Sequence, residues 1–405
     1  MRITILNQYY RPDIAPTAYL AASLAEGLAS KDHQVTVVAS KGGYVQPETR
    51  RQQENHDNPR VYRIWTPMLG KKSILQRCLD YLSYYILGLF RVLFLPRQDV
   101  IISLTTPPYL VWVALAHRLL RRRRTRVILW NMDCYPEAAE RAGKLKTNGI
   151  ASRIMRWGNR AVFKRIDHLV TLDTAMSDLL MQQYAPTKNP PKCTVIPNWE
   201  EASYFPPDVE APVWEGVERL GLADQFVVLY LGNMGEGHQF DTVIEAAKKL
   251  LGQAIIFLFI GGGAKVPLVE KAKAEYGLDN VILHPYVPKE VTDQVMSACD
   301  CALITLRDDM LGVMSPSKLH SNLALGLPIL YVGPETSNVD DAISDFNCGI
   351  SIRHGQADEV VQFIQQLSTN PDQHRLMRER ARDAFDKQYN DTQTLPQFER
   401  IIHAL

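Results

Sequence analysis

Two separate series of alternating strands and helices restrict the fold of this chain more than any other feature. The first series opens with an apolar strand at residues 2–6 and a helix at 17–30, and it continues as far as a strand at 168–172. A proline-rich acidic passage, residues 200–212, follows it, and a second series starts at residue 226. Because strand–helix alternation builds a parallel sheet covered by helices, we expect two α/β domains.

The domain boundaries and elements follow from the same pattern. We predict one domain at residues 1–199 and another at 200–385, with a helix over about 386–405 that packs back on the first. Further strands are expected at 34–39, 61–65, 100–104, 126–130, 226–231, 255–260, 281–283, 301–304 and 329–332. Further helices are expected from about 109 and at 241–251, 266–276, 289–298 and 318–325. Ligands bind beyond the carboxyl ends of such strands, so two doubly wound Rossmann-like domains facing across a cleft would share one active site there.

The cysteines and the hydropathy pattern narrow the class of protein. The six cysteines are scattered without a paired CxxC spacing, which argues against a disulfide framework or a zinc site and favours a reducing cytosol. Cys299 and Cys301 are expected to be small buried residues. No segment has the roughly 18 uninterrupted apolar residues of a spanning helix, and residues 1–6 resemble a strand more than a secretion leader.

Charge is divided unevenly between the two halves of the chain. Residues 1–199 hold 29 Lys and Arg against 14 Asp and Glu, a balance of +15, and residues 200–405 hold 16 against 30, or −14. The two values combine to the net charge of +1. Such a split predicts that the first domain alone meets a polyanionic surface, either a membrane or a nucleic acid.

A basic and apolar tract at residues 71–126 carries much of this charge. It contains 11 cations, namely Lys71, Lys72, Arg77, Arg91, Arg97, Arg118, Arg121, Arg122, Arg123, Arg124 and Arg126, against Asp80 and Asp99. Leucine and isoleucine recur at helical spacing at residues 75, 79, 82, 86, 89 and 93. An apolar stripe beside cations is typical of a helix in a bilayer interface. The alternative is ordinary core, but core packing gives the arginine run no partner.

Two segments of the second domain suggest an anion site. Gly232 and Gly235 follow a strand, where glycine allows close approach of the backbone to a diphosphate. Pro316 and Ser317 are expected to open and cap a helix, and Lys318 would stand in its first turn. A cation gains nothing there from the helix dipole, so we interpret Lys318 as a ligand for an anion. The alternatives are ordinary strand-ending glycines and a solvated lysine.

Asp133 is the candidate catalytic residue. It follows the strand at 126–130, and a carboxylate at such a position suits an acceptor hydroxyl that must be oriented or deprotonated. An Asx-turn or a helix cap before Pro136 is the structural alternative. Asp308 and Asp309 are adjacent acids, which are usually solvated loop residues, so we predict no metal site.

These segments, in this order, resemble glycosyltransferases of the GT-B fold, in particular family 4. The resemblance extends over essentially the whole chain, and it is closest for bacterial transferases that assemble O-antigen, exopolysaccharide and lipid-linked oligosaccharide. The matching segments are Asn7–Asp13, His33–Val37 ("GHeVtV"), Asp133–Glu137 ("DlwPe"), Ile196–Asn198, Leu231–Gly235, Gly261–Gly263, Asn280–Val287, Ala298–Asp300 and Pro316–Leu319. Each segment is degenerate alone, but their order and spacing together are specific.

The resemblance implies retention of anomeric configuration, a UDP-linked donor, and neither a metal nor another cofactor. It places the donor on Gly232, Asn233, Gly235, Gly262, Val287, Arg307, Ser315, Ser317, Lys318, Leu319 and Ser321. It places the acceptor near Tyr9, Tyr10 and Pro16, with Asp133 as the catalytic group. The expected acceptor is a lipid-linked or membrane-associated glycan, and the expected location is the inner face of the cell membrane.

Two departures from the family pattern affect the donor site. The paired glutamates of the family fall on Val313 and Ser321, and the Arg and Lys of its "GR…KG" segment fall on Asn233 and Gln239. Lys318, with Arg307, would then have to replace the missing phosphate cations, and Ser321 would bind the ribose. The subgroup with the "PSKL" segment shares these substitutions, so they do not indicate loss of activity.

Three other functions remain open from the sequence. An epimerase that hydrolyses a UDP-amino sugar shares the architecture but does not need the basic tract. A non-catalytic nucleotide-binding protein would bind UDP without turnover. A nucleic-acid binder ranks last, because the cations flank aliphatic stripes and lack an aromatic stacking surface.

Overall fold

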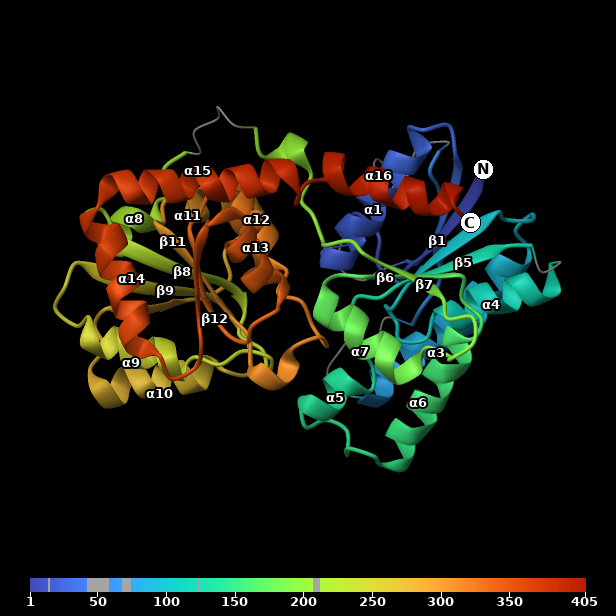
Figure 1. The fold of residues 1–405 in the computed structure, drawn as a ribbon, viewed down its shortest axis with the longest axis horizontal. Helices are drawn as coiled ribbons and strands as arrows, with labels where there is room; N and C mark the ends of the chain where they lie inside the picture. Colours follow the sequence, from blue (N-terminus) through green and yellow to red (C-terminus); the bar gives the residue numbers. More distant parts are fainter. Residues whose placement is uncertain (14, 42–57, 68–73, 122–123, 207–211) are drawn as a thin grey trace. The chain divides into compact units, whose positions relative to one another are not determined.

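The computed structural model describes the chain apart from residues 14, 42–57, 68–73, 122–123 and 207–211 and the side chains of residues 74, 75, 77 and 78. The predictions for Lys71, Lys72, Arg122 and Arg123, for the side chains of Leu75 and Arg77, and for part of the connection at 200–212 therefore lie outside the described residues. The chain forms two compact units (Figure 1). The N-terminal unit is Met1–Pro197 with Thr394–Leu405, and the C-terminal unit is Asn198–Gln393.

A parallel sheet of seven strands forms the centre of the N-terminal unit. Its spatial order is β3-β2-β1-β4-β5-β6-β7. The strands are β1 (Arg2–Leu6), β2 (Gln34–Ser40), β3 (Arg60–Ile64), β4 (Val100–Leu104), β5 (Arg126–Trp130), β6 (His168–Thr171) and β7 (Lys192–Val195). β1, β4 and β5 are buried along almost their whole length, as expected of strands covered on both faces.

Seven helices are described in this unit. They are α1 (Pro16–Ala29), α3 (Ile74–Leu93), α4 (Val111–Leu120), α5 (Glu137–Arg141), α6 (Ile150–Phe163), α7 (Thr174–Tyr184) and α16 (Asp391–His403). Local sequence explains some of their ends: the Asp173 side chain accepts the Met176 N–H at 2.7 Å and so caps α7. α5, α6 and α7 fill the interval between residues 130 and 184, for which the sequence predicted only a strand.

The last helix of the chain belongs to the N-terminal unit. The stretch predicted as one helix over about 386–405 is divided, because the chain leaves helical conformation between Lys387 and Asp391. On α16, the Phe398 ring lies 4.7 Å from the Trp130 ring, centroid to centroid. Both side chains are fully buried, so α16 completes the core beside β5.

The C-terminal unit contains a second parallel sheet, of six strands. Its order is β10-β9-β8-β11-β12-β13. The strands are β8 (Phe226–Asn233), β9 (Ile255–Gly262), β10 (Val281–His284), β11 (Cys301–Thr305), β12 (Ile329–Val332) and β13 (Gly349–Ile352). Its α-helices are α8 (Gly216–Arg219), α9 (Asp241–Lys249), α10 (Val266–Tyr276), α11 (Thr292–Ser297), α12 (Lys318–Ala324), α13 (Asn338–Phe346), α14 (Ala357–Thr369) and α15 (Pro371–Lys387). The two units are doubly wound Rossmann-like folds, as predicted.

Each sheet reverses its winding direction once, and the reversal determines where a ligand can reach the strand ends. In the N-terminal sheet the reversal lies between β1 and β4, and in the C-terminal sheet between β8 and β11. Loops diverge at such a switch point and leave a crevice at the carboxyl ends of the strands. The segments after β1 and β4, and after β8 and β11, are therefore the natural places for functional side chains.

A bilayer-spanning helix must be both long and apolar. Among the described residues, no helix combines the length and apolarity needed to cross a bilayer.

Candidate active site

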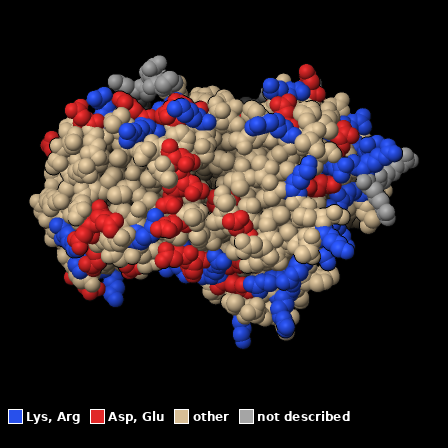
Figure 2. Space-filling model, in the orientation of Figure 1, with Lys and Arg blue, Asp and Glu red and all other residues tan. Residues whose placement is uncertain are grey.

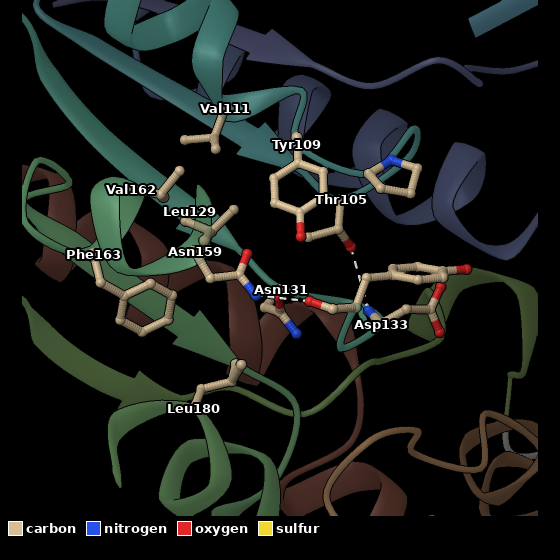
Figure 3. A pocket seen from close by; sticks show the side chains of 12 residues that line it. Thr105, Tyr109, Val111, Leu129, Asn131, Asp133, Asn159, Val162, Phe163 and Leu180 are labelled. Carbon is tan, nitrogen blue, oxygen red and sulfur yellow. Dashed lines mark hydrogen bonds between the residues drawn. The ribbon is translucent and has the colours of Figure 1, made fainter. Parts of the chain in front are cut away.

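A pocket of the N-terminal unit lies where β4 and β5 end. Its lining residues are Thr105, Pro108, Tyr109, Val111, Leu129, Asn131, Asp133, Tyr135, Asn159, Val162, Phe163 and Leu180. Figure 3 shows Asp133 at one edge, with Phe163 and Leu180 on the opposite side. The cavity of about 30 Å³ has room for a water molecule or two but not for a sugar ring. A sugar would therefore meet Asp133 at the rim.

Asp133 is a half-buried carboxylate with no structural partner. Its backbone N–H donates to Thr105 Oγ1 at 3.3 Å, which holds the segment against the end of β4. Among the described residues no group pairs with its carboxylate, and α5 starts after Pro136 without a side-chain cap. The structure therefore gives no support to the capping role. Burial raises the pKa of this carboxyl, a property common in groups that act on a ligand.

An ion-pair network that the sequence did not suggest connects the helices around the pocket. The Tyr184 hydroxyl on α7 donates to Glu137 on α5. Arg156 on α6 lies 3.6 Å from the Glu137 carboxylate and 2.5 Å from that of Glu140. Glu137 belongs to the predicted segment 133–137, but Arg156 and Tyr184 come from helices that were not predicted. No local signal could have identified them, because only the fold brings them together.

The turn after β4 is fixed between α3 and α6. Tyr109 has φ +66°, a left-handed backbone conformation that is energetically costly for a bulky residue. Residues in such strained conformations are found most often at functional sites. Its hydroxyl donates to Met155 O on α6 at 3.0 Å. On the other side, the Tyr85 hydroxyl of α3 donates to Pro108 O. α3 and α6 therefore border the same turn, which forms one wall of the pocket.

The predicted acceptor-side residues lie in the loop after β1. Pro16 is exposed at the start of α1 and Tyr9 is half-buried, whereas Tyr10 is buried. The Arg63 guanidinium stacks 5.6 Å from the centre of the Tyr10 ring and forms an ion pair of 3.3 Å with buried Asp13. Tyr10 therefore packs inside the loop. Of the three predicted acceptor-side residues, Tyr9 and Pro16 are the ones at its surface.

In the C-terminal unit, Lys318 points its ammonium toward the end of β8. A Cβ placed on Gly232 would lie 3.1 Å from Lys318 Cε, so the two predicted residues do meet. Nζ lies 4.7 Å from the centre of the Tyr230 ring. Within the described part of the chain, no carboxylate forms an ion pair with Lys318. Burial lowers the pKa of Lys318 to about 8.

His238 fixes the direction of the Lys318 ammonium. Its Nδ1 lies 2.7 Å from Thr305 O, a carbonyl that can only accept, so Nδ1 carries the proton. Nε2 is then the acceptor, and it lies 3.5 Å from Lys318 Nζ. Burial, reinforced by the Lys318 charge, lowers the pKa of His238 to about 3. The imidazole is therefore neutral and cannot act as the counter-ion of Lys318.

The glycines at the strand ends bring backbone close to this ammonium. β8 and β9 run on through Asn233 and Gly262, two residues beyond the predicted strand ends. Gly261 has φ +139°, and a Cβ there would collide with Gly232 O. Gly262 lies against Tyr286, since a Cβ on it would be 3.2 Å from that ring. The ends of β8 and β9 and the loop before Val287 are thereby packed together.

One detail of the donor prediction is wrong, although the helix expected at 241–251 is present as α9, which begins at Asp241. Ser317 does not cap α12: its backbone is already helical and its side chain accepts no N–H of the first turn. The sequence pattern of a cap was present, but a residue with helical φ and ψ cannot direct its hydroxyl to those donors. Without that cap, no Ser317 oxygen occupies the first N–H groups of α12, and Lys318 adds a full positive charge beside them.

Other predicted donor residues already have protein partners or are enclosed. Arg307 donates to Glu236 O at 2.9 Å and to Asp309 at 2.6 Å. The Ser321 hydroxyl donates to Lys318 O at 3.4 Å, and Leu319 is fully buried, so only its backbone is available. The remaining predicted residues, Asn233, Gly235, Val287, Ser315 and Ser317, are exposed or half-buried.

Potential metal ligands gather elsewhere. Cys299 and Cys301 are buried, and burial raises the pKa of both thiols. Across the described ranges, one group of three possible ligands is found, His33, Glu399 and His403, with ligating atoms within 4.8 Å of one another. These residues lie before β2 and on α16, apart from the segments that carry Asp133 and Lys318.

Comparison with known families covers both units. Residues 17–199 match the model of a glycosyl transferase 4-like domain, and residues 215–384 match that of glycosyl transferases group 1. The two matches adjoin at the connection between the units and share no residue. Together they include the segments that carry Asp133 and Lys318.

Individual relatives show the same likeness at low identity. The chain is 29% identical over 264 residues to the probable glycosyltransferase WbjE of Pseudomonas aeruginosa, a match covering 62% of each chain. It is 24% identical over 404 residues to the putative colanic acid biosynthesis glycosyl transferase WcaI of Escherichia coli (strain K12), covering 96% of this chain and 97% of that one. The structure of Anabaena HepE in complex with UDP matches 100% of both chains with a TM-score of 0.72 and 13% identity. That structural match shows the shared fold.

Proposed function

Because the chain belongs to the family 4 glycosyltransferases and has their GT-B fold, we propose that it uses a UDP-linked sugar and a membrane-associated acceptor. The transferred sugar would keep its anomeric configuration, as the family resemblance implies. WcaI is named as a putative colanic acid biosynthesis glycosyl transferase, which supports a role in polysaccharide assembly.

The observation that carries this proposal is the unpaired cation at Lys318. A lysine whose pKa is lowered to about 8 by burial is costly to keep charged unless an anion joins it. Its neighbours are a neutral imidazole, an aromatic ring and glycine backbone. A diphosphate is the anion that a sugar donor would bring, and Lys318 would stabilise the charge that develops on it as the sugar leaves.

Asp133 is proposed to act on the acceptor. In the reaction, the bond between the anomeric carbon and the diphosphate oxygen breaks, and a bond to the acceptor oxygen forms on the same face of the sugar. The acceptor hydroxyl loses its proton. A carboxylate whose pKa is raised is a better proton acceptor than an ordinary one, and among the described residues no protein partner competes for Asp133.

The direct test is nucleotide release. The protein would be incubated with a panel of UDP-, GDP- and dTDP-linked sugars and with membrane extract as the source of acceptor. We expect release of UDP that depends on the extract, with the sugar recovered in the lipid fraction. Free sugar released without any acceptor would instead indicate hydrolysis of the epimerase type, and nucleotide binding without turnover would indicate a non-catalytic protein.

Activity is expected to persist when divalent metals are removed. Lys318 supplies a positive charge for the diphosphate from the chain itself, and Asp308 and Asp309 offer no paired site because Arg307 contacts Asp309. Turnover in excess EDTA should therefore stay within about twofold of the untreated rate, against the far larger losses seen when a catalytic metal is removed. Complete loss in EDTA with recovery on adding Mg²⁺ or Mn²⁺ would contradict this prediction.

UDP affinity is expected to fall as pH rises through about 8, the pKa of Lys318. Below this pH the ammonium is charged and binds the diphosphate, and above it binding must first take up a proton. Calorimetry between pH 7 and pH 9.5 in buffers of different ionisation enthalpy would detect that uptake. The Lys318→Met variant is the control and should lack it. An affinity of the wild-type protein that does not change with pH would contradict the prediction.

Attachment to the inner face of the membrane is proposed through the N-terminal unit. On α3 the predicted stripe is in part turned outward: Leu79, Leu82 and Ile86 are exposed, and Phe90 is exposed beside them. Several cations of the basic tract at 71–126 have partners within the fold, which was not expected. Arg118 and Arg126 both pair with Asp167, and Arg121 donates to Leu93 O. Arg121 and Arg124 are both exposed, and among the described residues no partner is found for Arg124.

A further inference from the structure

Helix α6 exposes three large apolar side chains, which a helix that packs on a core normally buries. Ile150, Ile154 and Trp157 are 79%, 62% and 69% exposed. Their spacing places them on one stripe of the helix surface. Large apolar side chains that gather on a surface mark an interaction site. Nothing in the described part of the chain covers this stripe.

The sequence around this stripe is strongly basic. Residues 141–166 contain eight cations and no acidic residue. Arg153, Arg160 and Lys164 are exposed, and at about 100° per residue they lie along one flank of the stripe. In Figure 2, Lys and Arg gather over the part of the N-terminal unit that carries α4 and α6 in Figure 1.

The opposite face of α6 forms part of the Asp133 pocket. Val162 and Phe163 are buried and line it, and Asn159 donates to Tyr135 O at 2.7 Å. Arg156 is held by Glu137 and Glu140. These contacts fix the rotation of the helix about its axis, so the stripe cannot turn inward. The outward position of Trp157 is therefore a property of the fold.

We propose that α6 is the main contact of this protein with an anionic lipid surface, and that it sets the Asp133 pocket at that surface. The apolar stripe enters the interface while Arg153, Arg160 and Lys164 meet lipid phosphates. Arg121 has a smaller part, because it is already bonded within the fold. The lipid contact stands on its own, and only the delivery of an acceptor to Asp133 rests on the proposed function.

The geometry gives α6 a role in acceptor choice. One helix, about 10–12 Å across, separates the lipid-facing stripe from the pocket. A sugar joined to a lipid through a diphosphate stands in the headgroup layer, within that reach of Asp133. α3 also bonds to the Pro108–Tyr109 turn, through the Tyr85 hydroxyl, and it carries exposed apolar residues of its own, which can extend the contact. The acceptor class is thus a lipid-linked sugar held in the bilayer.

Vesicle binding by matched variants tests the contact. Sedimentation with phosphatidylcholine vesicles containing phosphatidylglycerol would compare the wild type with Ile154→Ser/Trp157→Ser. We expect the double variant to bind at least about tenfold more weakly, and binding of the wild type to require phosphatidylglycerol and to weaken with salt. The control, Leu268→Ser/Leu376→Ser, removes two exposed apolar residues from α10 and α15 of the other unit and should bind as the wild type does.

Charge variants separate the helix from the arginine run. Arg153→Glu/Arg160→Glu should weaken binding more than the change of Arg121 and Arg124 to glutamate does. In the wild type, the emission of Trp157 should shift to the blue on adding anionic vesicles, and Trp157→Phe should lose that shift. Equal vesicle binding by all variants, or dependence on the arginine run alone, would overturn the proposal. The proposal would also be overturned if the wild type were a dimer and the α6 variants dissociated it without changing vesicle binding.

UDP calorimetry and thermal melting keep the outcomes distinct. The α6 variants should melt as the wild type does and bind UDP equally well, because Lys318 belongs to the other unit. Failure of UDP to bind any variant would count against the proposed function while leaving the lipid result intact. In turnover, the α6 variants should lose activity on acceptor in membrane extract, by a factor similar to their loss in vesicle binding.

Discussion

Replacing Asp133 by asparagine is expected to lower turnover at least about a hundredfold and to leave UDP affinity nearly unchanged. The amide has the size of the carboxylate but cannot take the acceptor proton. Because Asp133 and Lys318 belong to different units, nucleotide binding should not respond. Initial rates of UDP release at saturating donor, together with calorimetry for UDP, would measure both effects. Turnover at the wild-type level would return Asp133 to a structural role.

Asp173→Asn is the matched control for this substitution. Asp173 also follows a strand of the N-terminal sheet, but it caps α7 through the Met176 N–H. Asparagine caps a helix about as well as aspartate does, so this variant should fold normally and keep its turnover. A hundredfold loss in both variants would show that the assay responds to any change of charge near the sheet.

Stability measurements provide a second readout for Asp133. Burial raises the pKa of its carboxyl, so the folded chain holds this proton more tightly than the unfolded chain. The wild type therefore loses stability as pH rises through the ordinary range of an aspartate and on to the raised value. Asp133→Asn lacks that loss. It should be the more stable protein at neutral pH, and the difference should vanish at pH values below the ordinary aspartate range.

The Lys318→Met variant should bind UDP about 1–3 kcal/mol more weakly, the range for a lost charge-assisted hydrogen bond, and yet resist unfolding better. Burial lowers the pKa of Lys318 from 10.5 to about 8, so the folded chain disfavours the ammonium at neutral pH. Removing it should stabilise the apo protein by on the order of 2 kcal/mol, since each pKa unit corresponds to about 1.4 kcal/mol and the side chain is partly exposed.

The pH dependence of this gain distinguishes charge from packing. The cost of the buried ammonium is fully present below pH 8 and disappears above 10.5, where the lysine is neutral in both states. Denaturant melts of the two proteins should thus converge as pH rises. Lys248→Met on α9 is the control: its ammonium is exposed and paired with Glu245, so neither UDP affinity nor stability should change appreciably. Unchanged UDP affinity in Lys318→Met would remove Lys318 from the donor site.

Much of the fold followed from the sequence because its signals are local. Buried parallel strands are short apolar runs, and the runs at 100–104 and 301–304 are bounded by turns that the chain itself supplies. α6 left no comparable signal. Its buried face holds polar Ser152, Arg156 and Asn159 beside Val162 and Phe163, and its apolar stripe faces outward. Periodicity alone would assign that stripe to the core.

The candidate site could be predicted only as far as residue type and strand ends determine it. Lys318 and Gly232 were expected to meet, and they do, because the ends of parallel strands share one edge of the sheet. The partners of the arginines were not predictable. Asp167 is 49 residues from Arg118 and 41 from Arg126, and only the packing of β5 and β6 brings these groups together. Whether a charged side chain is free depends on such distant contacts.

Because α16 belongs to the N-terminal unit, the coding sequence of the C-terminal unit is a single continuous segment. The C-terminal unit, Asn198–Gln393, is one uninterrupted insertion between the two parts of the other unit. Its ends lie side by side: the Glu200 N–H donates to Tyr389 O at 3.2 Å and the Asp391 N–H to Glu200 O at 3.1 Å. A recombination event at these two neighbouring points would exchange the whole C-terminal unit and keep Phe398 against Trp130. New pairings of the two units can therefore arise by cassette exchange, without rebuilding either core.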